Sequence, residues 1–180
     1  DVMQYITIAN TGNTTDFGDL TSARRQLSAC ASTTRGVYMG GDTGSVSNIL
    51  DYITIGSTGN ASDFGDLSAA TLGGGACSNS TRGLYGSGYT SANVNVIEFI
   101  TIASTGNASD FGDLLGAVVG ASGVANSVKA VFGGGNADSG SQNVLQTVTI
   151  ATAGDAVDFG NLTVVGYMSS GLSNGHGGLG

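Results

Sequence analysis

The acidic residues of this chain gather in a short block that recurs four times and whose chemistry could be that of a metal site. Seven of the 13 acidic residues lie in these blocks. The first copy reads Asp16-Phe17-Gly18-Asp19-Leu20, and the others begin at Asp63, Asp110 and Asp158. Asp-Phe-Gly binds magnesium in protein kinases, but the sequence has neither the glycine-rich loop nor the catalytic loop that must accompany it. The recurrence therefore predicts repeated architecture and not phosphoryl transfer.

Each residue type of the block has a structural role that the fixed spacing favours. We expect the aromatic residue to pack between neighbouring units, the glycine to lie at a bulge or a close backbone approach, and the acids to cap turns. The residues that carry this prediction are Phe17, Phe64, Phe111, Phe159, Asp16, Asp63, Asp110 and Asp158. Oxygen atoms of Asn13, Asp16 and Asp19 leave calcium as a less favoured alternative, because their spacing matches no EF-hand loop. We otherwise expect no cofactor and no metal.

Catalysis needs titratable groups that converge on one place, and this sequence offers few of them. The one histidine, His176, lies in a glycine-rich segment at the position that Arg35, Arg82 and Lys129 hold in the other units. No acid–base pair is tied to a single place, and no Gly-x-Ser-x-Gly motif supplies a nucleophile. The sequence thus predicts a protein that is not an enzyme and has no catalytic residues to assign.

The elements that position the blocks repeat with the same period. Successive blocks are 47, 47 and 48 residues apart. Upstream of each block, Thr alternates with β-branched residues, as in Tyr5-Ile6-Thr7-Ile8, which is typical of a half-buried strand. Between this strand and the block lies a turn, Thr-Gly-Asn or Ala-Gly-Asp, whose residues tolerate positive φ. Downstream, a basic residue, an apolar strand and glycines complete the unit.

Each unit is predicted to hold four short strands. In the first full unit these are Leu27 to Ala31, Gly36 to Gly40, Leu50 to Ile55 and Asp63 to Leu67. Four strands in about 47 residues is the period of a propeller blade. A lone blade cannot bury its faces, whereas several blades packed about an axis can, and first strands rich in Gly, Ala and Ser suit a crowded centre. The predicted fold is an all-β propeller of about four four-stranded blades.

The order of residues within a unit resembles a kelch repeat. A basic residue precedes an apolar strand, an aromatic residue and a double glycine, as in Gly36-Val37-Tyr38-Met39-Gly40-Gly41, and an aromatic residue then stands two residues before an acid. Kelch units usually carry Trp where this chain has the phenylalanine of each block. The sequence pattern Tyr-Ile-Thr-Ile, Thr-Gly-Asn, Asp-Phe-Gly-Asp-Leu is also similar to that of repeat proteins of marine and aquatic bacteriophage virions. That resemblance implies a tail or fibre component.

The two ends of the chain carry partial units. The units are predicted at 1–20, 21–67, 68–114, 115–162 and 163–180, with the last completing the first. Pairing of Gln4 to Ile8 with the segment near Gly177 to Leu179 would close a ring and remove its exposed edges. Two other assemblies stay open. Two chains can share an eight-bladed ring, or the half blades of successive subunits can pair and form a fibre.

Composition and charge exclude several classes of partner. The net charge is −8, so a polyanion such as nucleic acid would be repelled. No apolar run reaches the roughly 18 residues of a membrane span, so we expect no membrane insertion. Cys30 and Cys77 lie one repeat apart, and such equivalent positions are usually too distant for a disulfide, so both are predicted to be buried free thiols.

Function is expected where the repeat fails to repeat. Three loops differ between units: Asp42 to Asn48, Ser87 to Asn95 and Asn136 to Gln142. They fit either specialised recognition of a protein or a cell-surface glycan, or drift at exposed turns. Candidate glycosylation sites are Asn13, Asn60, Asn79, Asn107 and Asn161.

The predicted function is that of a structural or interaction module in a phage virion or outside a cell. Its partners are expected to be other virion or filament subunits and a surface glycan or protein. The alternatives are a subunit of a glycosylated extracellular filament and a lectin-like propeller.

Overall fold

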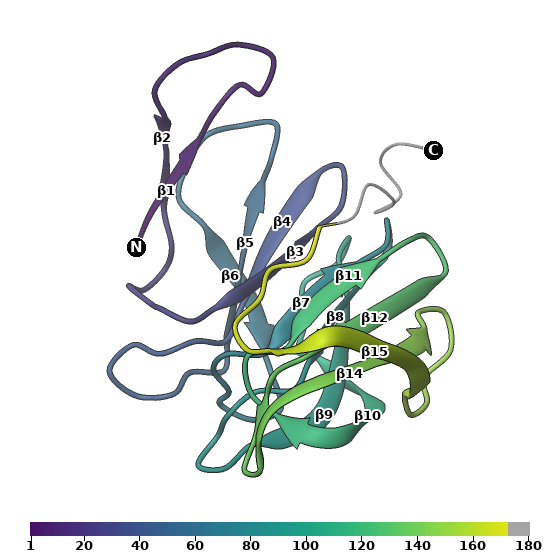
Figure 1. Ribbon diagram of the computed structural model, residues 1–180. Coiled ribbons are helices and arrows are strands. Elements are labelled where there is room, and N and C mark those ends of the chain that lie inside the picture. The colour runs from purple at the N-terminus through teal and green to yellow at the C-terminus, as the bar shows by residue number, and fades with distance from the viewer. Residues whose placement is uncertain (173–180) are drawn as a thin grey trace.

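The computed structural model describes residues 1–172, in which every regular element is a β-strand. The first complete sheet is an antiparallel meander of four strands: β3 (Ser28–Ala31), β4 (Arg35–Met39), β5 (Ile49–Thr54) and β6 (Ser62–Asp66). Each strand end lies within one residue of its predicted place. The strands of this unit and the all-β class are therefore confirmed (Figure 1).

Two further sheets repeat this strand order. The second holds β7 (Gly75–Ser78), β8 (Arg82–Gly86), β9 (Val94–Thr101) and β10 (Ser109–Val118). The third holds β11 (Ser122–Ala125), β12 (Lys129–Gly133), β14 (Gly140–Thr149) and β15 (Val157–Gly166), with the short β13 (Asn136–Ala137) paired to β14. At the N-terminus, β1 (Val2–Tyr5) and β2 (Thr15–Asp19) form a separate hairpin. The sequence repeat is thus also a structural repeat.

The first strand of the chain ends three residues earlier than the sequence predicts. A strand was expected over Gln4 to Ile8, but β1 ends at Tyr5. The equivalent β5 continues to Thr54 because β4 pairs with it there, through Arg35. β1 pairs with β2 alone, and that ladder ends at Tyr5 and Thr15. A strand without a second neighbour stops where its one ladder stops.

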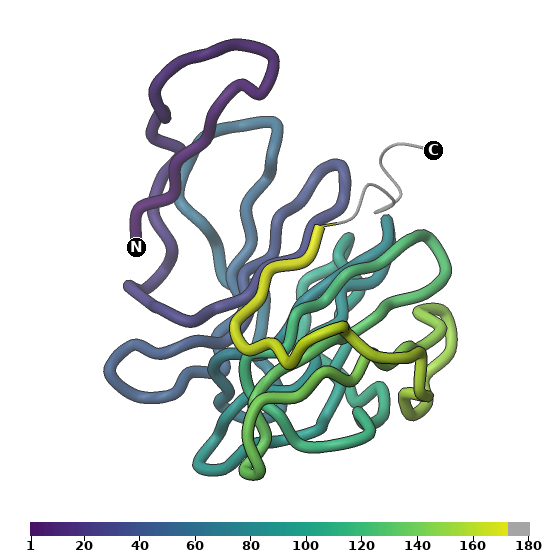
Figure 2. Tube along the Cα trace, viewed as in Figure 1, coloured from purple at the N-terminus to yellow at the C-terminus, as the bar shows by residue number. Residues whose placement is uncertain are grey.

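The first strands of the three sheets, β3, β7 and β11, lie side by side (Figures 1 and 2). Small residues allow this approach: a Cβ on Gly123 would lie 2.7 Å from the Ala76 carbonyl oxygen. Ser78 Oγ donates a hydrogen bond of 2.7 Å to the Ala31 carbonyl across one such boundary. Within residues 1–172 the sheets do not close into a ring, and the predicted pairing near Gly177 to Leu179 falls outside the described residues.

The hydrophobic core consists of two clusters, each between successive sheets. Phe64 lies in the cluster between the first and second sheets, and Phe111 lies in the cluster between the second and third. Both are 2% exposed, so the predicted packing of the phenylalanines between units is confirmed for them. Phe17 is half-buried. The prediction is wrong for Phe159, which is 57% exposed because no sheet of residues 1–172 covers the face of the third sheet on which it lies. No helix of residues 1–172 is long and apolar enough to cross a membrane.

Candidate functional site

The recurring block joins each sheet to the turn of the next unit by three hydrogen bonds, an arrangement that we call the clasp. At the boundary between the first and second sheets, Gly106 N donates to the Phe64 carbonyl at 2.7 Å and Ala108 N donates to the Asp66 carbonyl at 2.8 Å. Asp66 N donates to Oδ1 of Asn107 at 3.1 Å. The same three bonds recur at the other two boundaries, with Phe17, Asp19, Gly59, Asn60 and Ala61, and with Phe111, Asp113, Gly154, Asp155 and Ala156.

The glycine of the block is required by the geometry of the clasp. Gly112 has a φ of +144°, and its counterparts Gly18 and Gly65 have φ values of +142° and +144°. A Cβ on Gly112 would lie 2.5 Å from the Gly154 carbonyl oxygen. The ladder between β9 and β10 shifts register at Phe111, which forms a bulge. The prediction of a bulge and a close backbone approach is therefore confirmed. The capping groups are the turn side chains Asn60, Asn107 and Asp155, which accept from the backbone N–H of the second acid of each block. The prediction that the acids cap the turns is therefore wrong for these second acids, and the clasp does not involve the first acids, Asp16, Asp63, Asp110 and Asp158.

Gly112→Ala is expected to lower the free energy of unfolding by roughly 1–3 kcal/mol more than Gly160→Ala. Both residues have positive φ, so backbone strain is common to the two variants. A Cβ on Gly160 meets nothing within 4 Å, whereas a Cβ on Gly112 overlaps the Gly154 peptide. Urea unfolding followed by circular dichroism measures the difference. Equal losses would mean that the close approach at the clasp contributes nothing.

Arginines add a second tie across two of these boundaries. Arg35 Nη1 donates to the Ile102 carbonyl at 3.2 Å, and Arg82 Nη1 donates to the Ile150 carbonyl at 3.0 Å. Each guanidinium also lies over an aromatic ring of its own sheet, Tyr52 or Phe99, with the guanidinium carbon 4.6 Å from the ring centroid. The basic residue of the repeat is thus part of the sheet-to-sheet contact.

The carboxylates of the blocks do not converge, since the blocks lie in β2, β6, β10 and β15, which belong to four different sheets. Residues 1–172 contain no group of three or more His, Cys, Asp or Glu side chains placed to hold a metal ion. Calcium binding therefore stays a prediction to which no site can be assigned. His176 lies outside the described residues.

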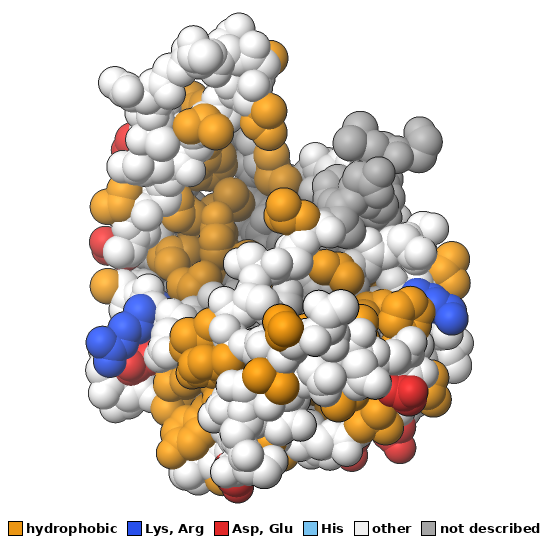
Figure 3. Space-filling view, in the orientation of Figure 1, with side chains coloured by type: hydrophobic (Ala, Val, Ile, Leu, Met, Phe, Trp, Pro, Cys, Tyr) orange, Lys and Arg blue, Asp and Glu red, His pale blue; other side chains and the backbone are white. Residues whose placement is uncertain are grey.

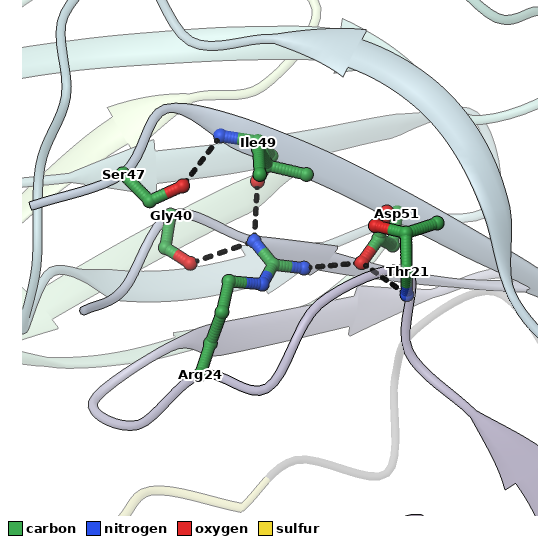
Figure 4. Close-up of polar contacts among 6 residues, drawn as sticks. All are labelled: Thr21, Arg24, Gly40, Ser47, Ile49 and Asp51. Atoms are coloured by element: carbon green, nitrogen blue, oxygen red, sulfur yellow. Dashed lines mark hydrogen bonds and ion pairs between the residues drawn. The ribbon is translucent and has the colours of Figure 1, made fainter. Parts of the chain in front are cut away.

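A buried ion pair in the first sheet is the most polar feature of the interior (Figure 4). Arg24 Nη2 and Asp51 Oδ2 are 2.6 Å apart, and both side chains are fully buried. Arg24 Nη1 also donates to the carbonyls of Gly40 and Ile49 at 2.8 and 2.7 Å. The hydroxyl of Thr21 donates to Asp51 Oδ1 at 2.6 Å. The pair ties the segment before β3 to the middle of β5.

The other sheets keep the acceptor of this pair but not its cation. Glu98 takes the place of Asp51 and accepts from Ser68 N at 2.8 Å, while Gln146 accepts from Leu115 N at 2.6 Å. Thr71 and Val118 stand where the first unit has arginine. A cavity of about 50 Å³ lies beside Thr71 and Glu98. This pair was not predicted from the sequence. The change of residue type between units at the positions of Arg24 and Asp51 could have indicated it.

An apolar groove of about 380 Å³ runs along the first strands and the open face of the first sheet. Its lining includes Cys30, Cys77, Tyr38, Ile53 and Gly171. Figure 3 shows hydrophobic side chains gathered in the hollow between the N-terminal hairpin and the rest of the molecule. Both cysteines are buried and free, which confirms that prediction. Burial raises the pKa of Cys77 to about 12 and raises that of Cys30 as well, so neither is a thiolate nucleophile at neutral pH.

Above pH 9 the protein is expected to lose stability because of these two thiols. The unfolded chain releases their protons near the ordinary pKa of 9.0, but the folded chain retains them. The contribution of the buried thiols to the free energy of unfolding is therefore fully present below pH 9. It falls as the pH rises from 9 toward about 12, with a slope that approaches about 1.4 kcal/mol per pH unit for each thiol. Urea midpoints measured with a reductant between pH 8 and pH 10, about the onset of the fall, test this. The double variant Cys30→Ala, Cys77→Ala should show a flatter profile, and an equally steep one would contradict the prediction.

The three variable loops share a hydrogen-bonded base and differ at their tips. In each, a backbone pair joins the loop to the preceding linker: Arg25 with Asp42, Leu72 with Tyr89, and Val119 with Asn136. Asn93 Nδ2 donates to Asp138 Oδ1 at 3.0 Å, so the second and third loops touch. Arg25 also pairs with Asp42, and its hydrogen bond holds the pKa of that carboxyl below the ordinary value. A shared base with different tips fits a scaffold that presents variable side chains.

The candidate glycosylation sites differ in what their amides already do. Asn13, Asn60, Asn107 and Asn161 are exposed. Asn79 is half-buried, and its Nδ2 donates to the Ser127 carbonyl of the next unit at 3.2 Å. A sugar on Asn79 would replace that bond, so this position is the least suited of the five. Glycosylation itself stays a prediction.

Comparison with protein-family models finds no match to this chain, and comparison with curated proteins finds none either.

Proposed function

We propose that this chain is a non-enzymatic structural and interaction module, whose repeated polar residues serve assembly of the sheets. The observation that carries the proposal is the clasp. At three boundaries the most acidic and most regular motif of the sequence forms hydrogen bonds between sheets, largely with its backbone. The backbone of the motif is committed to architecture, and its carboxylates lie on different sheets, so they form no assembled site for substrate chemistry within residues 1–172.

We further propose that the units are kelch-like blades of a small propeller. Support comes from the four-stranded meanders, from first strands that lie side by side, and from the aromatic residue between successive sheets. The hairpin β1–β2 corresponds to the third and fourth strands of a unit, and residues 167–180 follow β15 in the sequence. In this proposal the two partial units make a fourth blade, in one chain or between chains.

The module is proposed to be part of a phage virion, associated with the tail and able to bind a host surface. The resemblance of the repeat sequence to phage tail and fibre proteins suggests a place in the virion. The loops with a shared base and variable tips suggest that the module recognises a host surface. The loop tips expose Thr43 to Ser45, Ser91 to Ala92 and Asp138 to Ser139, which are small and mostly polar, like the adaptable hydrogen-bonding residues of antibody loops.

The experiment for this proposal is mass spectrometry on density-banded virions from the source sample. Peptides of this chain should band with the capsid protein and survive washing in high salt. Recovery only from a vesicle fraction or from unattached filaments would contradict a virion role. In the second case the glycosylated extracellular filament becomes the better assignment, which the exposed turn asparagines and the uncovered ends of the sheet array also favour.

A further inference from the structure

The third sheet has a face that its counterparts bury. Five equivalent positions in the first sheet, Cys30, Val37, Leu50, Phe64 and Leu67, are at most 7% exposed because the second sheet covers them. The same is true of Cys77, Leu84, Ile97, Phe111 and Leu114 beneath the third sheet. The equivalents in the third sheet are half-buried or exposed, and we call them the tail face: Val124, Val131, Leu145, Phe159 and Leu162. A groove of about 390 Å³ lies over four of them, and Ser169 to Gly171 of the same chain also line it.

The N-terminal hairpin carries the complementary surface. Ile6 and Ile8 are 58% and 93% exposed, and we call them, with the turn Gly12 to Thr14, the head face. Their counterparts Ile100 and Ile102 are 3% and 1% exposed because they pack against the first sheet. The counterparts in the third sheet, Val148 and Ile150, are equally buried against the second. Each internal boundary therefore joins one tail-type face to one head-type face, and within residues 1–172 no sheet covers the remaining face of each type.

Half of a clasp is also left at each of these faces. Within residues 1–172 the Phe159 carbonyl and the Asn161 backbone bond to no turn, whereas Phe17, Phe64 and Phe111 each accept from a turn glycine. The matching turn, Gly12 to Thr14, is likewise not clasped to any block of the described chain. Gly160 has φ +138, close to the +142 to +144 of the clasped glycines, so the block already has the conformation for binding.

We propose that the head face of one copy of this chain covers the tail face of a second copy and forms a fourth clasp between them. The second copy is the occupant because Ile8 stays 93% exposed and Phe159 57% exposed within residues 1–172, so the head face does not cover the tail face of the same molecule there. The contact continues an interface that the molecule already forms three times. Lys129 stands where Arg35 and Arg82 stand, and so lies within reach of the Ile8 carbonyl of the second copy.

Such a contact is head to tail, so it propagates into a closed ring of copies or an open filament. This inference rests on the proposed structural role, but it concerns the partner and the surface and not the location in a virion. A chain absent from virions can still associate in this way. A virion protein whose ends do not associate would contradict only the present inference.

The test is the mass of the purified protein in solution, measured by light scattering over a roughly hundredfold range of concentration. We expect masses that rise with concentration in multiples of the 17.7 kDa chain. Phe159→Asp and Ile8→Asp should each weaken association at least about a hundredfold, because a carboxylate would be buried without a partner. Leu115→Asp is the matched control, since Leu115 is 55% exposed on the second sheet, and should associate like the wild type. Unchanged urea midpoints at low concentration verify that the variants fold.

Mixing the two blocked variants tests the polarity of the contact. Phe159→Asp retains an intact head face and Ile8→Asp retains an intact tail face. Each alone should be monomeric, whereas the mixture should form a one-to-one dimer that grows no further. A mixture that stays monomeric would overturn the proposal, as would a wild-type chain that is monomeric at every concentration. In the latter case the tail face is covered by the chain itself or by another partner.

Discussion

Asp51→Ala is expected to lower the free energy of unfolding by about 3–5 kcal/mol, which is among the largest losses for a single substitution in this protein. The substitution leaves the guanidinium of Arg24 fully buried with only the carbonyls of Gly40 and Ile49 as acceptors. It also removes the acceptor of the Thr21 hydroxyl. The chain contains no Trp, so far-UV circular dichroism in urea is the suitable measurement.

The protein itself supplies the control for this experiment. The third unit has Val118 and Gln146 at the positions of Arg24 and Asp51, and Gln146 accepts from a backbone N–H at 2.6 Å. The double variant Arg24→Val, Asp51→Gln should therefore recover most of the stability, because it removes both charges and keeps an acceptor for Thr21 N. A double variant as unstable as Asp51→Ala would show that the loss comes from packing and not from an unpaired charge.

Phe111→Ala is expected to cost about 3–5 kcal/mol, the usual range for a buried aromatic residue replaced by alanine. Phe111 is 2% exposed, belongs to the cluster between the second and third sheets, and meets Phe99 edge to face with ring centroids 6.1 Å apart. Urea unfolding at low protein concentration measures the loss.

Phe159→Ala is the matched control for this prediction. Phe159 stands between an aspartate and a glycine, as Phe111 does, and lies at the same bulge. Unlike Phe111, however, it is 57% exposed. We expect its loss to stay below about 1 kcal/mol, in the range of surface substitutions. Similar losses for the two phenylalanines would contradict the conclusion that the covering sheet stabilises the block.

The strands of the repeat could be predicted from sequence because three independent signals agree in each unit. Alternation of Thr with β-branched residues, glycine turns and a fixed period all indicate the same element, as at Ile49–Thr54. The end of β1 could not be predicted in this way, because its extent depends on which neighbour pairs with it. The repeat indicates that β1 is equivalent to β5, but it does not indicate that β1 lacks the second neighbour that β5 has in β4.

The block illustrates the same division between local and non-local information. The bulge at the phenylalanine and the positive φ of the glycine are local, and both follow from sequence. The clasp is not local, since Asp66 N and Asn107 Oδ1 come from different units. Arg24 and Asp51 were missed because a repeat directs attention to what recurs, and this pair occurs in one unit of the described chain.

The uniformity of the clasp has a consequence for how the molecule loses structure. Within residues 1–172 the main contacts between sheets join neighbours in sequence, so the stability of the array is close to a sum of unit terms and nearest-neighbour coupling terms. The second sheet lies between two complete sheets, whereas the first has only the two-stranded hairpin on its other side, so the amides of the second sheet should exchange with solvent more slowly than those of the first and third. Opening then proceeds inward from either end. A chain with one unit more would need no contact that the three existing boundaries do not already supply.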